Sequence, residues 1–579
     1  MVVSLEENMV NVARLDELKQ RGALTVQAGK HTLVLFKYGE QVYAVDNRCP
    51  HMGFPLDKGT VKDGILTCHW HHARFDLASG GTFDQWADDV PSFPVEIRDN
   101  EIWVNLTPRS DPREHQRERL QVGLERDLSL VIGKAVLTLL DGDGSAVEPF
   151  RAGLEFGARY REGGWGQGLT MLTCFMNMLP HLHAEDRPRA LYQGLSAVAR
   201  DTVGNPPRFG IRPLPAFDAD IPTLKHWLRR FIEVRDDEGA ERCIISAIRA
   251  GATQQELADM LFAAVTDHRY IQVGHPADFT NKALEALDTA GWEYAEIVLP
   301  SLVRGYATAS RMEEANQWRN PIDLVAILEA AFDELADALQ DGEGKAWQGR
   351  DGLVNTLLQD DPQTSIDEML SALRAGATMT QLAQAVAYAA ALRIAQFHTS
   401  NEFGDWDTAL HTFTFANAMH EGLRRAPSLE LLRGVFDAAM SVYLDRFLNI
   451  PAARLPRPNG AAGEPAALLA EFPELLNQQQ QVNEAGKSVA DYLHYGGTDS
   501  ELLAMLGRLL LREDRDFHTI QCVEAAFRQY DYLRGTEAGT HVLVGAARYL
   551  AAHSPTVRAQ GQTYTIARRL HRGEKVFEG

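Results

Sequence analysis

The spacing of apolar residues changes near residue 107, and this change limits the fold more than any other feature. Before it, apolar and polar residues alternate in the short runs LTVQA, HTLVLF and QVYAV, which Gly29 and Gly39 separate. The later run VEIRDNEIWVNL carries Asp99-Asn100 between two alternating halves, as a β-hairpin requires. Farther on, apolar residues recur three and four apart, which is typical of helices. We therefore expect a multidomain chain, with a small all-β N-terminal domain followed by a large all-α domain.

The helical sequence contains repeats. SAIRAGATQQELADM (246–260) and SALRAGATMTQLAQA (371–385) agree at nine of fifteen positions, and DYLHYGGTDSELLAM (491–505) keeps the glycine, the threonine and the following leucine. Gly251, Gly376 and Gly496 lie 125 and 120 residues apart, so each copy is a module of several helices. The glycine is expected to end one helix in the left-handed conformation, and the threonine to cap the next. The motif thus predicts a helix joint that is used three times.

These patterns predict six segments along the chain. A densely charged stretch follows the β domain, and we expect a solvated linker or an exposed connecting helix there. The expected segments are 1–107 (β domain), 108–130 (charged linker or connecting helix), 131–240 (helical, a candidate degenerate repeat), 241–365 (first helical repeat), 366–485 (second) and 486–579 (third).

Charge and cysteine content exclude several kinds of partner. The chain of 579 residues has 57 Lys and Arg against 79 Asp and Glu, and its net charge of −22 repels nucleic acid and anionic lipid. Cys174, Cys243 and Cys522 stand alone in helical sequence, so no disulfide framework is expected and a reducing cytoplasm is favoured. No run of 18 uncharged apolar residues occurs, so no membrane partner is expected. The sequence does not indicate an oligomeric state.

The two remaining cysteines lie in two short clusters with histidines. CPHMGFPLDKGTVKDGILTCHWHH supplies Cys49 and His51, and then, after sixteen intervening residues, Cys68 and His71. Two thiolates and two imidazoles could hold zinc in a tetrahedral site. However, each loop offers one thiolate and one imidazole, an order that suits two irons, one bound by both cysteines and the other by both histidines.

This stretch, with the following ARFDLASG, resembles a Rieske [2Fe-2S] domain of the oxygenase-ferredoxin type. The resemblance implies that Cys49, His51, Cys68 and His71 bind the cluster. The helical part could not be matched securely to a family.

The residues beside the ligands indicate the type of Rieske domain. Phe54 and Trp70 stand where the respiratory-complex type has a further pair of cysteines, and Ala73 and Phe75 stand where that type has a serine and a tyrosine. Hydroxyl donors to a cluster sulfur stabilise the reduced cluster, so their loss predicts a low reduction potential. His72 occupies a position where the family usually has glycine.

A second redox site is expected in the helical part, though not that of a standard Rieske oxygenase α subunit. The 2-His-1-carboxylate pattern D/E-x-x-H-x-x-x-x-H is absent from the sequence. Histidines recur instead at related places in the repeats, and bundles build metal sites from such side chains. Axial haem ligation is an alternative, as are core histidines copied by ancestry. The candidate catalytic residues are His275, His398, Glu402, His411 and His518.

Two functions follow from these patterns. In the first, the chain is an O₂-dependent monooxygenase or oxidase whose [2Fe-2S] cluster takes electrons from an NAD(P)H-dependent reductase. The electrons then pass to an additional iron, a haem or a small organic substrate in the helical domain. In the alternative, the chain is an electron carrier or redox sensor whose helical repeats dock a separate enzyme.

Overall fold

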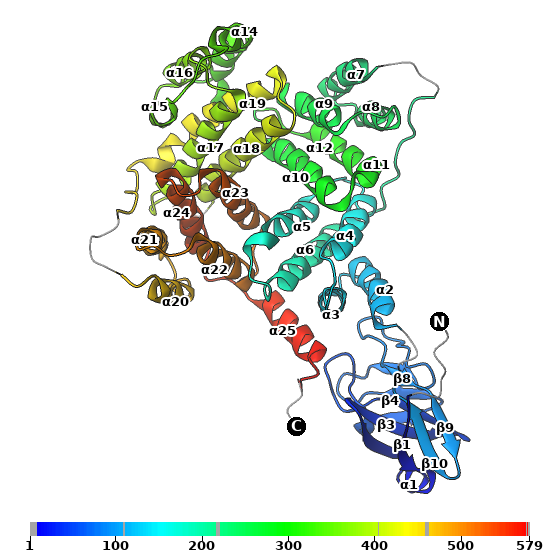
Figure 1. Ribbon diagram of the computed structural model, residues 1–579. Helices are drawn as coiled ribbons and strands as arrows, with labels where there is room; N and C mark the ends of the chain where they lie inside the picture. The colour runs from blue at the N-terminus through cyan, green and yellow to red at the C-terminus, as the bar shows by residue number, and fades with distance from the viewer. Residues whose placement is uncertain are drawn as a thin grey trace. The chain divides into compact units, whose positions relative to one another are not determined.

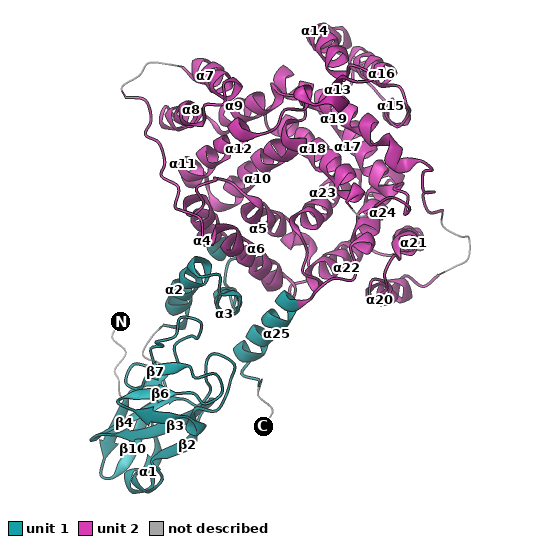
Figure 2. Ribbon diagram, turned by 180° about the vertical axis from the view of Figure 1, so that it is seen from behind, with its two compact units in different colours: residues 1–149, 559–579 teal, residues 150–558 magenta. Residues whose placement is uncertain are grey.

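The computed structural model describes residues 8–107, 111–215, 220–402, 404–457, 463–574 and 576. The chain divides into two compact units, one formed by residues 1–149 and 559–579 and the other by residues 150–558 (Figures 1 and 2). The expected order of a β domain followed by a large helical region is confirmed. The C-terminal helix α25 (Ala559–His571) belongs to the first unit.

The β domain consists of three antiparallel sheets, with strand orders β1-β10-β9, β2-β3-β4-β8 and β5-β6-β7. The predicted turns are present: Gly29 and Gly39 have positive φ, and Asp99 (φ 47°) and Asn100 (φ 68°) join β9 to β10 in the left-handed conformation that a two-residue hairpin turn needs. The strands are β1 Met9–Arg14, β2 Ala23–Ala28, β3 His31–Tyr38, β4 Gln41–Asp46, β5 Thr60–Lys62, β6 Ile65–Thr67, β7 Arg74–Asp76, β8 Ser92–Phe93, β9 Val95–Arg98 and β10 Glu101–Asn105; helix α1 is Leu15–Arg21.

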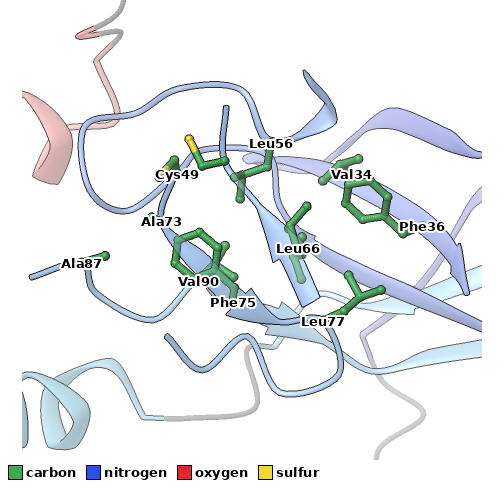
Figure 3. Packing of buried hydrophobic residues seen from close by; sticks show 12 residues of the cluster. Val34, Phe36, Cys49, Leu56, Leu66, Ala73, Phe75, Leu77, Ala87 and Val90 are labelled. Atoms are coloured by element: carbon green, nitrogen blue, oxygen red, sulfur yellow. The ribbon is translucent and has the colours of Figure 1, made fainter. Parts of the chain in front are cut away.

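One hydrophobic core of this domain includes the two cluster cysteines. Figure 3 shows Cys49, Ala73 and Ala87 toward one end of the core and Phe36 at the other. Cys49 and Cys68 are only 2% and 1% exposed. The core therefore fixes the backbone that carries both thiols.

Two helices of the first unit follow the β domain, α2 (Pro112–Glu125) and α3 (Ser129–Leu139). A helix was among the expectations for 108–130, but the expected exposure is wrong for one face of α2. Gln116 and Arg119 are buried there because both bond to the region of Asp88: Gln116 Nε2 donates to its Oδ2 at 2.8 Å, and Arg119 Nη2 donates to the Ala87 carbonyl at 2.6 Å.

Across the described stretches of the chain, no helix combines the length and apolar character needed to cross a membrane. The second unit is helical. Its helices are α5 Gln167–Met178, α6 Arg187–Thr202, α7 Ile221–Glu233, α8 Asp237–Arg249, α9 Gln254–Thr266, α10 His275–Ala290, α11 Ala295–Val298, α12 Val303–Thr308, α13 Asn316–Arg319, α14 Leu324–Gly342, α15 Arg350–Leu357, α16 Pro362–Arg374, α17 Met379–Ala395, α18 Asp405–Arg425, α19 Leu429–Leu444, α20 Pro465–Leu475, α21 Val482–His494, α22 Asp499–Arg512, α23 Phe517–Leu533 and α24 Glu537–Ala552; α4 is Val147–Arg159.

The repeat motif forms the predicted joints. Gly251, Gly376 and Gly496 have φ of 83°, 100° and 83° and end α8, α16 and α21. Thr253 and Thr378 cap the following helices with complete capping boxes. The expected cap at the third joint is wrong: Thr498 makes no side-chain cap, and Glu501, three residues farther on, lies 3.5 Å from His183 Nε2.

Four helices of this unit surround a common axis. Helix α10 packs against α18 and α5, and α23 packs against the same two helices, so α10 and α23 lie diagonally opposite (Figure 2). Side chains from all four helices meet along this axis, which is where bundles build their polar and metal sites.

Candidate functional site

The two loops that carry the Cys and His pairs are tight turns of the β domain. In the first, which follows β4, the Cys49 N–H donates to the Phe54 carbonyl at 2.8 Å, and the Gly53 N–H donates to the Cys49 carbonyl at 2.7 Å. In the second, between β6 and β7, the Cys68 N–H donates to the Ala73 carbonyl at 2.9 Å. These bonds fix both cysteines.

The structure brings the four sequence-predicted ligands together. The rings of His51 and His71 lie 4.8 Å apart, nearly perpendicular, and the thiols of Cys49 and Cys68 are hydrogen-bonded to each other. We name Cys49, His51, Cys68 and His71 the cluster residues.

The chemistry of these residues fits a [2Fe-2S] cluster. His51 Nδ1 is buried and has no hydrogen-bond partner within the described chain, which is costly unless a bound group such as a metal ion satisfies it. Burial, then His71 and Lys134, lowers the pKa of His51 to about 4, so its ring is neutral at pH 7 and keeps a free lone pair. The hydrogen bond with Cys49 lowers the pKa of the Cys68 thiol to about 6, which favours the thiolate that binds iron.

Aromatic and apolar groups surround the cluster residues. The rings of Phe54 and Trp70 lie 6.1 Å apart, Trp70 lies 4.4 Å from the ring of His71, and Ala73 and Phe75 are fully buried. Neither of the last two side chains offers a hydroxyl group. The low reduction potential expected from the sequence stays a prediction.

His72 has φ of 63°, in the left-handed region. A glycine adopts this conformation without strain, whereas other residues incur a steric cost of about 1–2 kcal/mol. The turn therefore requires the left-handed conformation, which explains why glycine is usual at this position. His72 adopts the same conformation at a steric cost.

A buried carboxylate connects the helices of the first unit to the cluster loop. Lys134 Nζ donates to the Pro50 carbonyl and to Asp88 Oδ2, both at 2.9 Å, and His115 Nε2 lies 2.7 Å from Asp88 Oδ1. Burial alone would raise the pKa of Asp88, but Lys134 and His115 hold it well below its usual range. A permanent ion pair thus supports the backbone between Cys49 and His51.

A second set of imidazoles meets in the helical unit. His275 is the first residue of α10, His411 lies in the second turn of α18, and His518 is the second residue of α23. One ring nitrogen from each lies within 4.8 Å of the other two. We name these residues the three-histidine site; they are three of the five candidates from the sequence.

The electrostatics of this site suit a cation. His411 Nε2 and His518 Nε2 lie 3.1 Å apart, a distance at which two lone pairs repel unless a proton or a metal ion lies between them. Burial, then His518, lowers the pKa of His275 to about 4; burial, then His275 and His518, lowers that of His411 to about 3. Nitrogens that bind one metal at about 2.1 Å lie roughly 3.0–3.4 Å apart, so His275 must move inward slightly.

A carboxylate that the sequence analysis missed lies beside His518. Asp407 Oδ2 is 3.8 Å from His518 Nδ1, and Asp407 Oδ1 accepts a hydrogen bond from the Tyr549 hydroxyl at 2.7 Å. The contact with His518 is longer than a hydrogen bond; carboxylates that reach hydrogen-bond distance orient metal-binding histidines. The sequence feature that could have indicated Asp407 is its position one helical turn before His411.

The segment before His275 is strained. Tyr270, Gln272 and Val273 have φ of 39°, 46° and 48°, which is unusual for any of them and most unfavourable for the β-branched valine. Gly274 follows with φ of 92°, and a Cβ there would lie 2.7 Å from Phe415 Cβ. Such strain persists only where the surrounding packing imposes it, and it clusters at functional sites.

The other two candidates lie elsewhere. His398 follows the end of α17, and its Nδ1 lies 2.6 Å from Ser400 Oγ. Glu402 is exposed, and its N–H donates to Asp405 Oδ2. Within the described residues, neither joins the histidine triplet.

The fold and the cluster loops define an iron–sulfur electron-transfer domain. Residues 8–94 match the family model of the Rieske [2Fe-2S] domain. The chain is 30% identical over 98 residues to the 3-phenylpropionate/cinnamic acid dioxygenase ferredoxin subunit of Photorhabdus laumondii, covering 92% of that protein and 17% of this chain. The chain therefore belongs, through its N-terminal domain, to the Rieske [2Fe-2S] family, which implies a [2Fe-2S] cluster.

Two further relatives match over a similar length. The alkene monooxygenase system ferredoxin component of Xanthobacter autotrophicus is 26% identical over 100 residues, which cover 82% of it and 17% of this chain. Human apoptosis-inducing factor 3 is 28% identical over 100 residues, and the chain spans only 16% of its length. The family model ends at residue 94 and does not describe the helical unit.

Proposed function

We propose that the chain is an oxidoreductase in which a Rieske cluster passes electrons to a metal ion in the helical unit. The four cluster residues would hold the [2Fe-2S] group, and the three-histidine site would hold the second metal. The observation that carries the proposal is the convergence of three imidazoles from three helices on one point. Imidazole is a ligand that suits iron.

A three-histidine site leaves metal positions open for O₂ and substrate, and bound iron would supply O₂ activation. A monooxygenase reaction consumes the substrate R–H, O₂, two electrons and two protons, and yields R–OH and water. An NAD(P)H-dependent reductase would donate the electrons through the cluster, one at a time. The chain's own part is to orient His518 through Asp407 and to fix His275 through the strained segment.

Metal analysis of the intact chain, purified without oxygen, tests this proposal. We expect one iron beyond the two of a [2Fe-2S] cluster. His411→Ala should remove that iron and leave the EPR signal of the Rieske cluster unchanged. His494→Ala, in an exposed histidine at the end of α21, is the matched control and should keep all the iron.

Oxygen uptake with a reductase and NAD(P)H tests the electron transfer. His411→Ala should lower uptake while the cluster is still reduced. Two irons and no other metal in the wild-type chain, or zinc in place of the third iron, would contradict the proposal and favour an electron carrier that docks a separate enzyme. His398→Ala tests the prediction from the sequence that His398 is a catalytic residue. If this variant keeps the third iron, His398 is not a ligand of the metal site.

A further inference from the structure

A cavity of about 510 Å³ opens beside His411 in the helical unit. Its lining includes Tyr270, which is 6% exposed and whose ring stacks at 6.0 Å on that of Trp318, a residue with 0% exposure. Its volume falls in the range of about 300–1,000 Å³ that is typical of sites for small molecules. The accessible aromatic surface next to the three-histidine site is therefore that of Tyr270, with Trp318 stacked against it.

The rim of this cavity is apolar and exposed. Ile322 and Phe447, both among its lining residues, are 39% and 55% exposed. Exposed apolar side chains at the edge of a concave site are typical of ligand-binding grooves. An apolar ligand would cover both side chains as it enters.

One buried carboxylate of the cavity has a free oxygen. Asp445 is 3% exposed and lines the cavity; its Oδ2 accepts a hydrogen bond from Thr412 Oγ1 at 2.6 Å. Within the described residues, Oδ1 has no hydrogen-bond partner. A carboxylate oxygen accepts hydrogen bonds, so a ligand that donates one can bind here. Burial raises the pKa of Asp445 to about 7, so the carboxylate is mostly charged above that pH.

The cation of the cavity is already paired. Arg446 pairs with Asp360, and its guanidinium lies 4.0 Å from the centre of the Tyr443 ring. An anionic ligand would therefore meet the Asp445 carboxylate without a free cation to offset the repulsion. The wall favours a neutral ring compound that carries a hydrogen-bond donor.

We propose that this cavity binds neutral hydroxylated aromatic compounds, with the hydroxyl donating to Asp445 Oδ1 and the ring against Tyr270. The claim that these compounds are substrates of the three-histidine site rests on the proposed function. The claim that they bind in the cavity can be tested independently of that function. The location places the ligand ring beside His411.

Calorimetric titration with 2-naphthol and 2-methoxynaphthalene tests the hydrogen bond, because the two probes share a ring system and differ in the donor. At pH 8, above the pKa of about 7 that burial gives Asp445, the wild-type chain should bind 2-naphthol at least about tenfold more tightly, as expected for a hydrogen bond to a charged group. In Asp445→Asn, the amide oxygen can keep the Thr412 bond while the NH₂ faces the cavity, so the preference should fall to about threefold or less. Equal binding of both probes to the wild type would overturn the proposal.

A rim variant tests the location. Ile322→Asp should weaken both probes at least about tenfold by opposing apolar burial. Val557→Asp is the matched control at an exposed apolar residue outside the cavity lining and should not change either affinity. Unchanged binding to Ile322→Asp would overturn the assignment. Metal analysis of the same samples separates the two proposals: a donor preference without a third metal supports the cavity and refutes the metal site, and the reverse result does the opposite.

Discussion

The buried lysine of helix α10 gives the sharpest stability prediction. Lys282 is 1% exposed, and its Nζ lies 2.9 Å from Glu285 Oε2 and 2.6 Å from Glu524 Oε2. Asn177 on α5 donates to both of these carboxylates, at 2.7 and 2.9 Å. Burial alone would lower the pKa of Lys282, but the two carboxylates hold it well above its ordinary value. The lysine is therefore charged at pH 7.

Lys282→Met removes this charge and keeps much of the side-chain volume. Arg528 then remains as the cation, 3.7 Å from Glu285 and 4.0 Å from Glu524, so one buried carboxylate lacks a partner charge. Removing one partner of a buried ion pair costs about 3–5 kcal/mol. We expect the free energy of unfolding at pH 7 to fall by that amount.

Urea unfolding followed by far-UV circular dichroism measures this loss, and its pH dependence tests the cause. The unpaired carboxylate would have a folded-state pKa above its unfolded value, so the penalty is complete above the folded pKa and shrinks as the pH falls through it. Lys282→Met with Glu524→Gln restores the charge balance and should recover most of the loss. A loss below about 1 kcal/mol, as for an exposed pair, or an equal loss at pH 5 and 7 would refute the reasoning.

Four further variants test the two sites and the residues beside them. His72→Gly should stabilise the first unit by about 1 kcal/mol in thermal unfolding, because glycine adopts φ of 63° without strain; an unchanged midpoint would contradict this. Gly274→Ala should release the third iron and keep the Rieske signal, because its Cβ meets Phe415; full iron content would count against the role of the strained segment. Burial raises the pKa of Asp278 from 3.8 to about 8, so between these pH values the folded state keeps a proton that the unfolded state loses. As the pH rises through this range, the free energy of unfolding should fall by up to about 1.4 kcal/mol per pH unit relative to that of Asp278→Asn. Parallel stability curves of the two proteins against pH would exclude the raised pKa. Ala73→Ser should raise the reduction potential of the cluster by about 40 mV, if its hydroxyl gives a sulfur a hydrogen bond of about 1 kcal/mol; a voltammogram without a positive shift would refute this.

Local signals in the sequence were sufficient to predict the turns of the β domain and two of the three helix joints. Gly29, Gly39 and Asp99-Asn100 mark turns whose conformation depends on their own residues, and the turns form where predicted. The left-handed glycines of the repeats behave in the same way. Such features need no knowledge of distant packing, so a single sequence reveals them.

The three-histidine site could be predicted only in part, because its members meet through tertiary packing. His398 and His518 share the FHT motif and the same distance from a repeat glycine, yet α17 ends at Ala395, before His398, whereas α23 begins at Phe517 and carries His518 into the bundle. The strain at Tyr270, Gln272 and Val273 has no sequence signal, since only Gly274 marks that segment. The cavity residues come from four separate helices and loops and show no common pattern.

The buried charges and the three-histidine site depend on the same alignment of α10 and α23. From one end of the axis, Asp278 pairs with Gln521, Lys282 with Glu524, and Glu285 with Arg528, so the partners follow one another in the same direction along both helices. The next pair toward the helix starts is His275 and His518, whose ring centres lie 5.8 Å apart. A slip of one turn would move one helix by about 5.4 Å, separate all three of these polar pairs and carry the imidazoles out of reach of one metal. An apolar axis would tolerate such a slip far better, so the lysine and its carboxylates contribute the positional specificity that a three-histidine metal site requires.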